Sequence, residues 1–425
     1  MRILLLTQYF APEVGASQVR LSAFCRELKA AGHEVEVVTA MPHHPEGRIY
    51  PGYRGRFYLR ETLDGITVHR VWLYAAKGSG FQRILTYLSF AFFCLFGLLR
   101  ASRPDYLFVD APPLFLAVPG WLASRLWKTR FIFNVADLWP DSVLDLGIMS
   151  PGLATNLGFA LEKWTYRHAD FVTAVTEGIR TSLLERKNVP STKILFLPNG
   201  VDTSLFQPAT LPDERLRAQL GLCGKKIVLY AGNHGYANAV GQLIEAASLI
   251  SDPGIHFLLV GDGPEKPLLQ GLARRSRLSN VTFLHSVPIE KLPSFLSIAS
   301  IAAVTLIKSR ITEGARPAKT FVMMAAGKPI VLAGQGESAD LVREANAGLI
   351  VPPHSPHDFA AAVLLLANDS DLATRMGQNG RAFVQAHFGW SLLVRDWLAQ
   401  LRRAFPPPES SSPRRAENST APTAS

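Results

Sequence analysis

The 425-residue chain is poor in cysteine, and it lacks a dinucleotide-binding fingerprint and a signal-peptide pattern. Its three cysteines, Cys25, Cys94 and Cys223, are far apart and odd in number. They form neither a disulfide framework nor a metal-binding spacing, which favours a reducing compartment. No G-x-G-x-x-G dinucleotide fingerprint occurs. The apolar run at residues 3–7 soon turns polar, so it predicts a buried first strand rather than a signal peptide, and we expect a cytoplasmic protein.

Positive charge is in excess, with a formal net charge of +10 at pH 7. This balance favours an anionic partner, which could be nucleic acid, a sugar nucleotide or phospholipid headgroups. No basic stripe alternates with aromatic residues, and no nucleic-acid-binding signature is present. Nucleic acid is therefore the least favoured of the three, and we expect none as a partner.

The apolar pattern describes two α/β domains. Strand-length runs at residues 3–7 and 35–39 flank a helical spacing at residues 18–30, which predicts the β-loop-α-β unit of a doubly wound parallel sheet. From residue 208 to residue 224 the composition becomes polar, and the strand and helix pattern then restarts. The chain is too long for one ordinary core, so two Rossmann-like domains fit best. We assign the chain to an N-terminal domain (1–205), a C-terminal domain (206–388), a last helix (389–405) and a disordered tail (406–425).

Three N-terminal loops follow predicted strands, where sheets of this kind bind ligands. The first contains Gly15 and Ala16, which allow a ligand to approach the backbone closely. The second, residues 41–58, contains His43 and His44. They could contact a ligand or could simply be polar residues on the surface. The third, residues 136–142, could position sugar hydroxyl groups. Its candidates are Asp137, Trp139 and Asp141, although Asp141 could instead cap the next helix.

Two strongly apolar segments, residues 84–99 and 114–127, separate these loops. The first is uncharged and, as a helix, a little too short to span a bilayer. A buried core helix or an interfacial helix fits its length better. Trp121 and Trp127 lie near cationic residues, as at a membrane–water boundary. Core packing and peripheral contact with an anionic membrane surface both remain open.

Residues 316–340 are the part of the chain around which we expect an anion-binding site to form. The pattern predicts a loop, a helix ended by Gly327, a strand, and a Gly-rich turn that begins another helix. Free backbone N–H groups at a helix start, with a lysine beside them, form an anion site. Lys319 is the cation candidate, and the sequence predicts a bound nucleotide diphosphate here.

The order of several motifs resembles the GT-B glycosyltransferases of family 4 over nearly the whole chain. These motifs are the Pro-Asn-Gly-Val-Asp linker from residue 198, the Val-Gly-Asp-Gly-Pro turn from residue 260, and the Pro-x-Lys helix from residue 317. The Asp-Leu-Trp-Pro-Asp-Ser loop from residue 137 is most similar to the WbuB-like bacterial subgroup, which builds surface polysaccharides on a lipid carrier. The resemblance implies a GT-B fold, in which two doubly wound domains face each other across a cleft.

The resemblance also implies chemistry. We expect a nucleotide-sugar donor, UDP- or GDP-linked, a lipid-linked or glycolipid acceptor, anomeric retention, no cofactor and no metal. The implied catalytic residues are Lys319, Asp137 and Glu313. Donor binding is assigned to Gly232, Asn233, Gly261, Arg316, Lys319, Gly336, Glu337 and Ser338. Acceptor binding is assigned to Gly15, Ala16, His43, His44, Asp137, Trp139 and Asp141.

The chain departs from the family pattern at three positions. Val322 replaces a ribose-binding glutamate, Ala136 replaces a histidine, and Asn233-His234 replaces a basic pair. Glu337 could substitute at the ribose, and Arg310 or Arg316 at the phosphates. These departures leave two alternatives open: a catalytically degenerate GT-B protein that binds a membrane or partner, and an enzyme of other nucleotide-sugar chemistry such as epimerisation.

Overall fold

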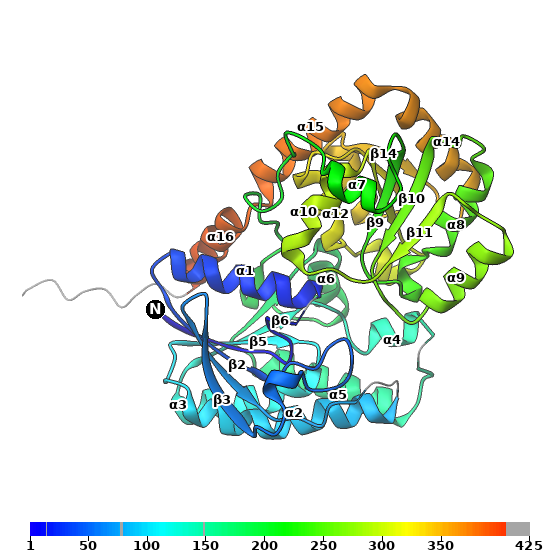
Figure 1. Cartoon of the computed structure of the whole chain (residues 1–425). Helices are drawn as coiled ribbons and strands as arrows, with labels where there is room; N and C mark the ends of the chain where they lie inside the picture. The colour runs from blue at the N-terminus through cyan, green and yellow to red at the C-terminus, as the bar shows by residue number, and fades with distance from the viewer. Residues whose placement is uncertain (14, 77–79, 148, 405–425) are drawn as a thin grey trace, which may run out of the picture.

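The computed structural model describes residues 1–13, 15–76, 80–147 and 149–404, and it contains two separate sheets (Figure 1). The N-terminal sheet has eight strands in the order β3-β4-β2-β1-β5-β6-β7-β8. All of its neighbouring pairs are parallel except β3 with β4. Its strands are β1 (Arg2–Leu6), β2 (Glu34–Ala40), β3 (Tyr58–Leu63), β4 (Ile66–Val71), β5 (Tyr106–Ala111), β6 (Arg130–Val135), β7 (Phe171–Ala174) and β8 (Ile194–Phe196).

The antiparallel hairpin β3–β4 extends one edge of this sheet. Leu63 pairs with Ile66, so only Asp64 and Gly65 form the turn. Both turn residues have positive φ, 51° and 70°, as a two-residue type I′ turn requires. The Asp-Gly dipeptide is a hairpin signal in the sequence, but our sequence analysis did not predict these two strands.

Helices cover both faces of the N-terminal sheet. On one face lie α2 (Phe81–Arg100), α3 (Ala117–Trp127) and α5 (Leu153–His168), and on the other lies α1 (Ala16–Ala30). Shorter elements complete the domain: η1 (Pro51–Tyr53), η2 (Leu114–Leu116), α4 (Asp141–Asp145), α6 (Glu177–Thr181), the π-helical turn η3 (Ser182–Arg186) and η4 (Ser191–Lys193).

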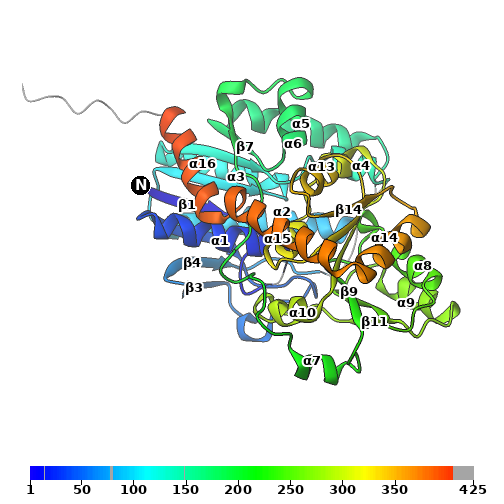
Figure 2. The same ribbon diagram turned by 90° about the horizontal axis from the view of Figure 1, so that it is seen from above.

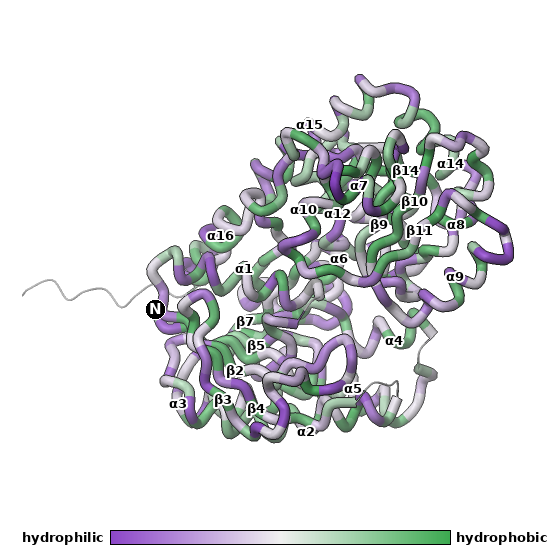
Figure 3. The backbone as a smooth tube through the Cα atoms, viewed as in Figure 1, coloured by the Kyte–Doolittle hydropathy of each residue, from purple (hydrophilic) through white to green (hydrophobic). Residues whose placement is uncertain are grey.

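The C-terminal sheet has six parallel strands in the order β11-β10-β9-β12-β13-β14. They are β9 (Lys226–Ala231), β10 (Ile255–Val260), β11 (Val281–Leu284), β12 (Ile301–Thr305), β13 (Ile330–Ala333) and β14 (Gly348–Val351). The four central strands, β10, β9, β12 and β13, are buried on both faces and are rich in apolar residues, as is usual for parallel sheets. Figure 3 shows the same concentration of hydrophobic residues along the central strands of both domains.

The helices of the C-terminal domain form two layers. One core layer includes residues of α8 (Gly241–Leu249), α9 (Lys266–Arg275) and α14 (Pro356–Asn368). The other includes residues of α10 (Leu292–Ile298), α12 (Ala318–Ala325), α13 (Glu337–Glu344) and α15 (Ser370–His387). The remaining elements are α7 (Glu214–Gln219), η5 (Tyr236–Asn238), η6 (Ile289–Lys291) and α11 (Arg310–Glu313).

The last helix, α16 (Trp390–Ala404), returns to the N-terminal domain. Figure 2 shows α15 and α16 running one after the other across both domains. Trp397 is fully buried and lies edge-on to Phe24 of α1 and Phe108 of β5, with ring centroids 5.2 and 5.8 Å away. The end of the chain is therefore part of the N-terminal core.

Helix α2 differs from the sequence expectation. It spans 20 residues and is long and apolar enough to cross a membrane by length and composition, so the prediction that it is too short was wrong. One side of it packs on the sheet through Phe90, Cys94 and Leu98. Its other side is exposed. Helix α2 is therefore neither fully buried in the core nor exposed on all sides.

Candidate functional site

Loops of the two domains meet between the sheets. A Cβ added to Gly178, at the start of α6, would lie 2.7 Å from Cα of Gly314, after α11. Gly178 has no side chain, which allows this close approach of the two backbones. The residues predicted to bind donor and acceptor lie on the loops that follow the strands on either side of this contact.

Lys319 lies at the start of α12, beside the end of β9. Its ammonium group donates to the hydroxyl of Tyr230 at 2.9 Å and to Oδ1 of Asn238 at 2.7 Å. It also lies 4.3 Å from the centre of the Tyr230 ring. These partners carry no full negative charge, and burial lowers the pKa of Lys319 to about 7. An anion bound here would stabilise the charged ammonium.

Gly232 places bare backbone next to this lysine. A Cβ on Gly232 would lie 3.3 Å from Cε of Lys319, and its φ is 158°. Its neighbour Asn233 accepts a hydrogen bond from the Tyr230 hydroxyl, 2.7 Å, through its carbonyl oxygen. The structure thus brings together three of the predicted donor-binding residues: Lys319, Gly232 and Asn233.

The loop containing Gly261 packs directly on this one. His234 N–H donates to the Asp262 carbonyl at 2.9 Å. Lys266 fixes the second loop, because its ammonium group donates to the carbonyls of Gly261 and Leu284 and to Asp262 Oδ1, at 2.7, 2.8 and 2.8 Å. All three of its protons have partners, so Lys266 acts as a structural cation and leaves Lys319 as the one facing the candidate phosphate site.

His234 has an unusual environment in the same loop. The side chain is fully buried, yet both ring nitrogens lack a hydrogen-bond partner among the described residues. Burial lowers its pKa to about 4, so the imidazole is neutral near pH 7. The ring contacts Tyr230 and Phe283, with centroids 5.6 and 6.2 Å apart. The basic residue expected at this position is therefore replaced by an uncharged one.

Glu337 connects the two domains. Its carboxylate accepts backbone hydrogen bonds from Gly178 and from Glu177 (3.2 Å) at the start of α6, and it pairs with Arg316 Nε at 2.8 Å. A carboxylate at a helix N-terminus is favourable for the helix dipole. Glu337 and Arg316, two of the three groups that we considered as ribose or phosphate ligands, thus form an ion pair with each other.

The neighbouring residues support this carboxylate. Gly336 has a φ of 68°, and a Cβ there would collide with the Glu313 backbone. The Ser338 hydroxyl donates to the Ala315 carbonyl at 2.6 Å, and the Glu313 carboxylate accepts from Gln335. Glu313, Gly336 and Ser338 therefore lie together next to α13, at the domain contact.

A second carboxylate crosses the cleft in the opposite direction. Asp145 at the end of α4 accepts from Ile311 N–H of α11 at 3.2 Å. A cavity of about 300 Å³ lies beside it, lined by Asp141, Leu144, Asp145, Arg186, Arg310 and Ile311. Arg310, our alternative phosphate ligand, thus lies at this domain contact. We call the pair formed by Glu337 and Asp145 the reciprocal clasp.

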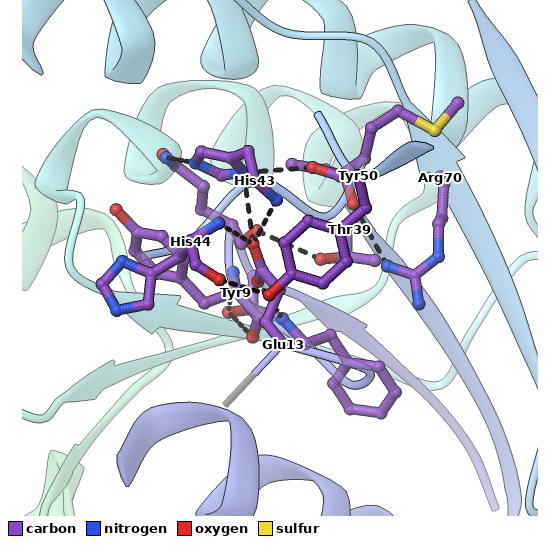
Figure 4. Close-up of polar contacts among 12 residues, drawn as sticks. Tyr9, Glu13, Thr39, His43, His44, Tyr50 and Arg70 are labelled. Atoms are coloured by element: carbon purple, nitrogen blue, oxygen red, sulfur yellow. Dashed lines mark hydrogen bonds and ion pairs between the residues drawn. The ribbon is translucent and has the colours of Figure 1, made fainter. Parts of the chain in front are cut away.

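On the N-terminal side a buried carboxylate organises the histidine loop (Figure 4). Oε1 of Glu13 accepts from the backbone N–H groups of His43 and His44, at 2.7 and 2.8 Å, and Oε2 accepts from Phe10 N–H at 3.3 Å. The Tyr50 hydroxyl donates to the His44 carbonyl at 2.6 Å. The ring of Tyr9 stacks on His43 and meets His44 edge-on.

Burial sets the protonation of this cluster. It raises the pKa of Glu13 to about 7, although the backbone donors oppose the rise, and it lowers the pKa of His43 to about 4. Neutral His43 can donate from Nδ1 to the Met41 carbonyl, 3.0 Å away. His44 is more exposed, and its pKa is lowered by burial and by Arg83. The ring of His44 is therefore the accessible imidazole of the loop.

The three candidate side chains of the third predicted loop differ in how accessible they are to a ligand. Asp137 is exposed and accepts from the Ser142 hydroxyl at 2.9 Å. Trp139 packs against α5, where a Cβ on Gly158 would lie 2.8 Å from its ring. Asp141 forms ion pairs with Arg186 and Lys187 at 2.7 and 2.5 Å. Of the three, Asp137 has the side chain most available to a ligand. Gly15 lies at the start of α1, directly before Ala16, close to the Glu13 cluster.

Two functional candidates escaped the sequence analysis. Glu13 lies two residues before Gly15 in the first N-terminal loop, and Asp145 lies at the end of α4; the sequence pattern assigned neither of them a role. A buried role for Glu13 follows from contacts with residues 43 and 44, thirty positions away. The donor, acceptor and catalytic assignments themselves stay predictions, now with defined positions.

Two doubly wound domains whose loops meet between the sheets are the architecture of the GT-B fold. Residues 15–200 match the family described as "Glycosyl transferase 4-like domain", and residues 212–383 match the family "Glycosyl transferases group 1". The chain is 30% identical over 343 residues to WcaI of Escherichia coli (strain K12), which is named as a colanic acid biosynthesis glycosyl transferase. The match covers 79% of this chain and 84% of WcaI. The chain belongs to glycosyltransferase family 4, whose enzymes use nucleotide-sugar donors.

Solved structures agree on the fold. Sucrose-phosphate synthase from Thermosynechococcus elongatus superposes with a TM-score of 0.74 at 21% identity, covering 95% of this chain and 98% of the synthase. Anabaena HepE in complex with UDP-glucose superposes with a TM-score of 0.72 at 16% identity, covering 95% and 100%. These structures confirm the predicted GT-B fold, and the family match confirms that the chain is a glycosyltransferase.

Proposed function

We propose that this enzyme transfers a sugar, with anomeric retention and without a metal, to a lipid-linked or glycolipid acceptor at the inner face of the cytoplasmic membrane. The product would be part of a cell-surface polysaccharide. The name of WcaI, which refers to colanic acid biosynthesis, supports the polysaccharide assignment. The observation that carries the lipid assignment is the exposed apolar surface of the N-terminal domain.

That surface, which we call the apolar face, is formed by α2, α3 and α5. Its exposed residues are Phe81, Ile84, Leu85, Leu88, Phe92, Leu99, Val118, Leu122, Leu126, Leu153 and Leu157. No acidic residue lies within α2 or α3, whereas Arg100, Arg125 and Lys128 are exposed at their ends. Contiguous apolar surface of this kind marks an interaction site. Flanking cations favour an anionic lipid surface as the partner.

The chemistry places a different demand on each domain. As the donor breaks down, negative charge develops on the departing nucleotide diphosphate, and preorganised donors must stabilise it. Lys319, at the start of α12, and the backbone beside Gly232 are the groups positioned for this role. Asp137 and His44 would contact the acceptor hydroxyl groups from the opposite side of the cleft.

Purified protein incubated with a panel of nucleotide sugars and polyprenyl-diphosphate-linked saccharides tests the reaction. We expect the acceptor mass to rise by one sugar, an α-linked product from an α-linked donor by NMR, and unchanged turnover in a chelator. Absence of transfer and of donor hydrolysis across the whole panel would contradict the proposal.

Membrane contact has a separate test. We expect the double variant Leu88→Glu/Phe92→Glu on α2 to lose binding to vesicles containing phosphatidylglycerol in a flotation assay. The matched control is Leu268→Glu/Leu365→Glu, which alters two exposed leucines of the C-terminal domain. Equal binding by both double variants would show that the apolar face is not the membrane contact.

A further inference from the structure

A second cavity lies in the N-terminal domain, away from the contact between the domains. It measures about 490 Å³, and its lining includes Arg48, Ile49, Arg54, Trp72, Leu73 and Tyr74. We call it the arginine cavity. It lies between the histidine loop, which supplies residues 48, 49 and 54, and the segment that follows β4, which supplies residues 72–74.

The two arginines give the cavity a positive charge without compensation from its own walls. No acidic residue is among those that line it. Within the part of the chain that the structure describes, Arg54 bonds only through Nε, to the Ile49 carbonyl at 2.9 Å, and Arg48 has no recorded partner. The terminal guanidinium nitrogens of both residues are thus available, and a pair of guanidinium groups suits a phosphate or diphosphate.

One side of the arginine cavity adjoins the acceptor-side cluster. The loop that carries Arg48 and Arg54 begins with His43 and His44, and Tyr50 ties it back to the His44 carbonyl. A group bound at the arginines would therefore have its attached sugar within reach of the predicted acceptor residues.

The other side adjoins helix α2. Tyr74 N–H donates to the Ser89 hydroxyl of α2 at 2.9 Å. The Trp72 ring meets the Phe93 ring edge-on, with centroids 5.0 Å apart. Phe57, which is exposed, packs on Phe93 as well, at 5.2 Å. The wall of the cavity is thus continuous with the helix that carries most of the apolar face.

We infer that the arginine cavity binds the phosphate or diphosphate ester of an amphipathic acceptor, whose sugar reaches the cleft and whose hydrocarbon chain follows α2. The arginines would bind the phosphate of such a molecule, and the aromatic side chains lead from them to the apolar helix, along which its hydrocarbon chain would lie. This inference rests on the proposed function, because it names the recognition site for the lipid-linked acceptor.

The test compares Arg48→Ala/Arg54→Ala with the wild-type enzyme. We expect the KM for a polyprenyl-diphosphate saccharide to rise at least tenfold, with kcat and the KM for the nucleotide sugar little changed. The control, Arg56→Ala/Arg60→Ala, removes two exposed arginines of the same region that do not line the cavity. Circular dichroism melting would show that both variants remain folded.

Two further measurements distinguish the sources of phosphate. Inorganic pyrophosphate should inhibit wild-type transfer competitively with the acceptor and should affect the double alanine variant less. Flotation with phosphatidylglycerol vesicles should be unchanged by the double substitution. Loss of vesicle binding together with an unchanged acceptor KM would overturn the inference and assign the arginines to membrane headgroups.

Failure of this inference can be separated from failure of the proposed function. If the wild-type enzyme transfers sugar to lipid-linked acceptors but the double variant keeps the wild-type KM, only the inference is wrong. If the wild-type enzyme uses phosphate-free acceptors equally well, the cavity has no role in acceptor recognition and the inference is also wrong.

Discussion

We predict that Lys319 links donor binding to proton uptake. Its ammonium group is held by two neutral oxygens and burial lowers its pKa to about 7. At pH 8 roughly nine-tenths of a group with this pKa is neutral. A diphosphate placed beside it raises the pKa again, because the opposite charge favours the protonated form.

We therefore predict that nucleotide-sugar binding at pH 8 takes up close to one proton, and that uptake nearly disappears at pH 6. Titration calorimetry in buffers of different ionisation enthalpy measures this number. Lys319→Met should abolish the uptake and lower kcat by about 10²- to 10³-fold, the range found when one preorganised donor is removed. Near-normal turnover in this variant would move the phosphate site elsewhere.

The second prediction concerns Glu13 and the pH dependence of the free energy of unfolding. Its pKa rises on folding from 4.5 to about 7, so between these values the native state binds more protons than the unfolded state. The free energy of unfolding therefore falls as pH rises through this window, by roughly 3 kcal/mol in total for a difference of about 2.5 in pKa. The lowered pKa of His43 has the opposite sign, since unfolded histidine binds protons first as pH falls.

Urea unfolding of Glu13→Gln and wild type at pH 5 and pH 8 isolates the carboxylate. We expect the variant to gain relative stability at pH 8, because it carries no buried charge, while at pH 5 both proteins have a neutral side chain. Glu46→Gln, an exposed glutamate of the same loop, serves as the control and should show no such change. A pH-independent difference for Glu13→Gln would show that Glu13 is ionised throughout.

At the scale of elements, α2 is anchored to the sheet at Gly97. A Cβ there would lie 2.8 Å from Cγ1 of Val38 on β2 and 3.0 Å from Cγ1 of Val71 on β4. Glycine lets the helix backbone approach two β-branched residues, and any larger residue overpacks the interface. This contact keeps one side of α2 inside the domain while the other side carries the apolar face.

Gly97→Val should destabilise the protein by about 1–3 kcal/mol, which corresponds to a fall in Tm of roughly 2–4 °C per kcal/mol for a domain of this size. Differential scanning calorimetry measures it. Gly271→Ala on α9 is the control, since an added Cβ meets only the flexible Arg275 side chain at 3.4 Å. A helical glycine without close neighbours gains stability on replacement by alanine, so a similar loss in both variants would refute tight packing at Gly97.

Elements differ in how well their pattern predicted them. Buried parallel strands such as β1, β9 and β10 are short continuous apolar runs, which the chain presents without ambiguity. The hairpin β3–β4 was missed because β3 mixes charged and apolar residues at a half-exposed edge, and because the buried strand β4 includes His69 and Arg70. The length of α2 was also misjudged, since its polar first turn does not continue the apolar run from residue 84.

For the molecule as a whole, the reciprocal clasp determines how the two domains meet. Glu337 of the C-terminal domain satisfies N–H groups at the start of α6, and Asp145 of the N-terminal domain satisfies one in α11. Each carboxylate thus fills donors that would otherwise lack partners at a helix start. Closing the cleft satisfies both sites at once.

Removing the clasp should shift the protein towards an open form. Hydrogen bonds to a charged group contribute about 1.5–3 kcal/mol, so Glu337→Ala should favour opening by roughly ten- to a hundredfold. Small-angle X-ray scattering should show a larger radius of gyration. Asp340→Ala removes an exposed carboxylate that pairs with Arg343 of the same helix, and it should leave the scattering unchanged. Identical curves for all three proteins would mean that other contacts hold the domains together.

The sequence by itself determined the buried parallel strands such as β1, β9 and β10, the loops that follow them and the position of Lys319 at a helix start. These depend on local periodicity and on glycine and proline positions, which act over a few residues. Only the tertiary structure decided that Glu337 and Arg316 bind each other, that Glu13 holds residues 43 and 44, and that Arg48 and Arg54 share a cavity with Trp72. The physical reason is that burial, charge pairing and cavities arise between segments distant in the chain, and no local pattern specifies which of many possible partners a side chain meets.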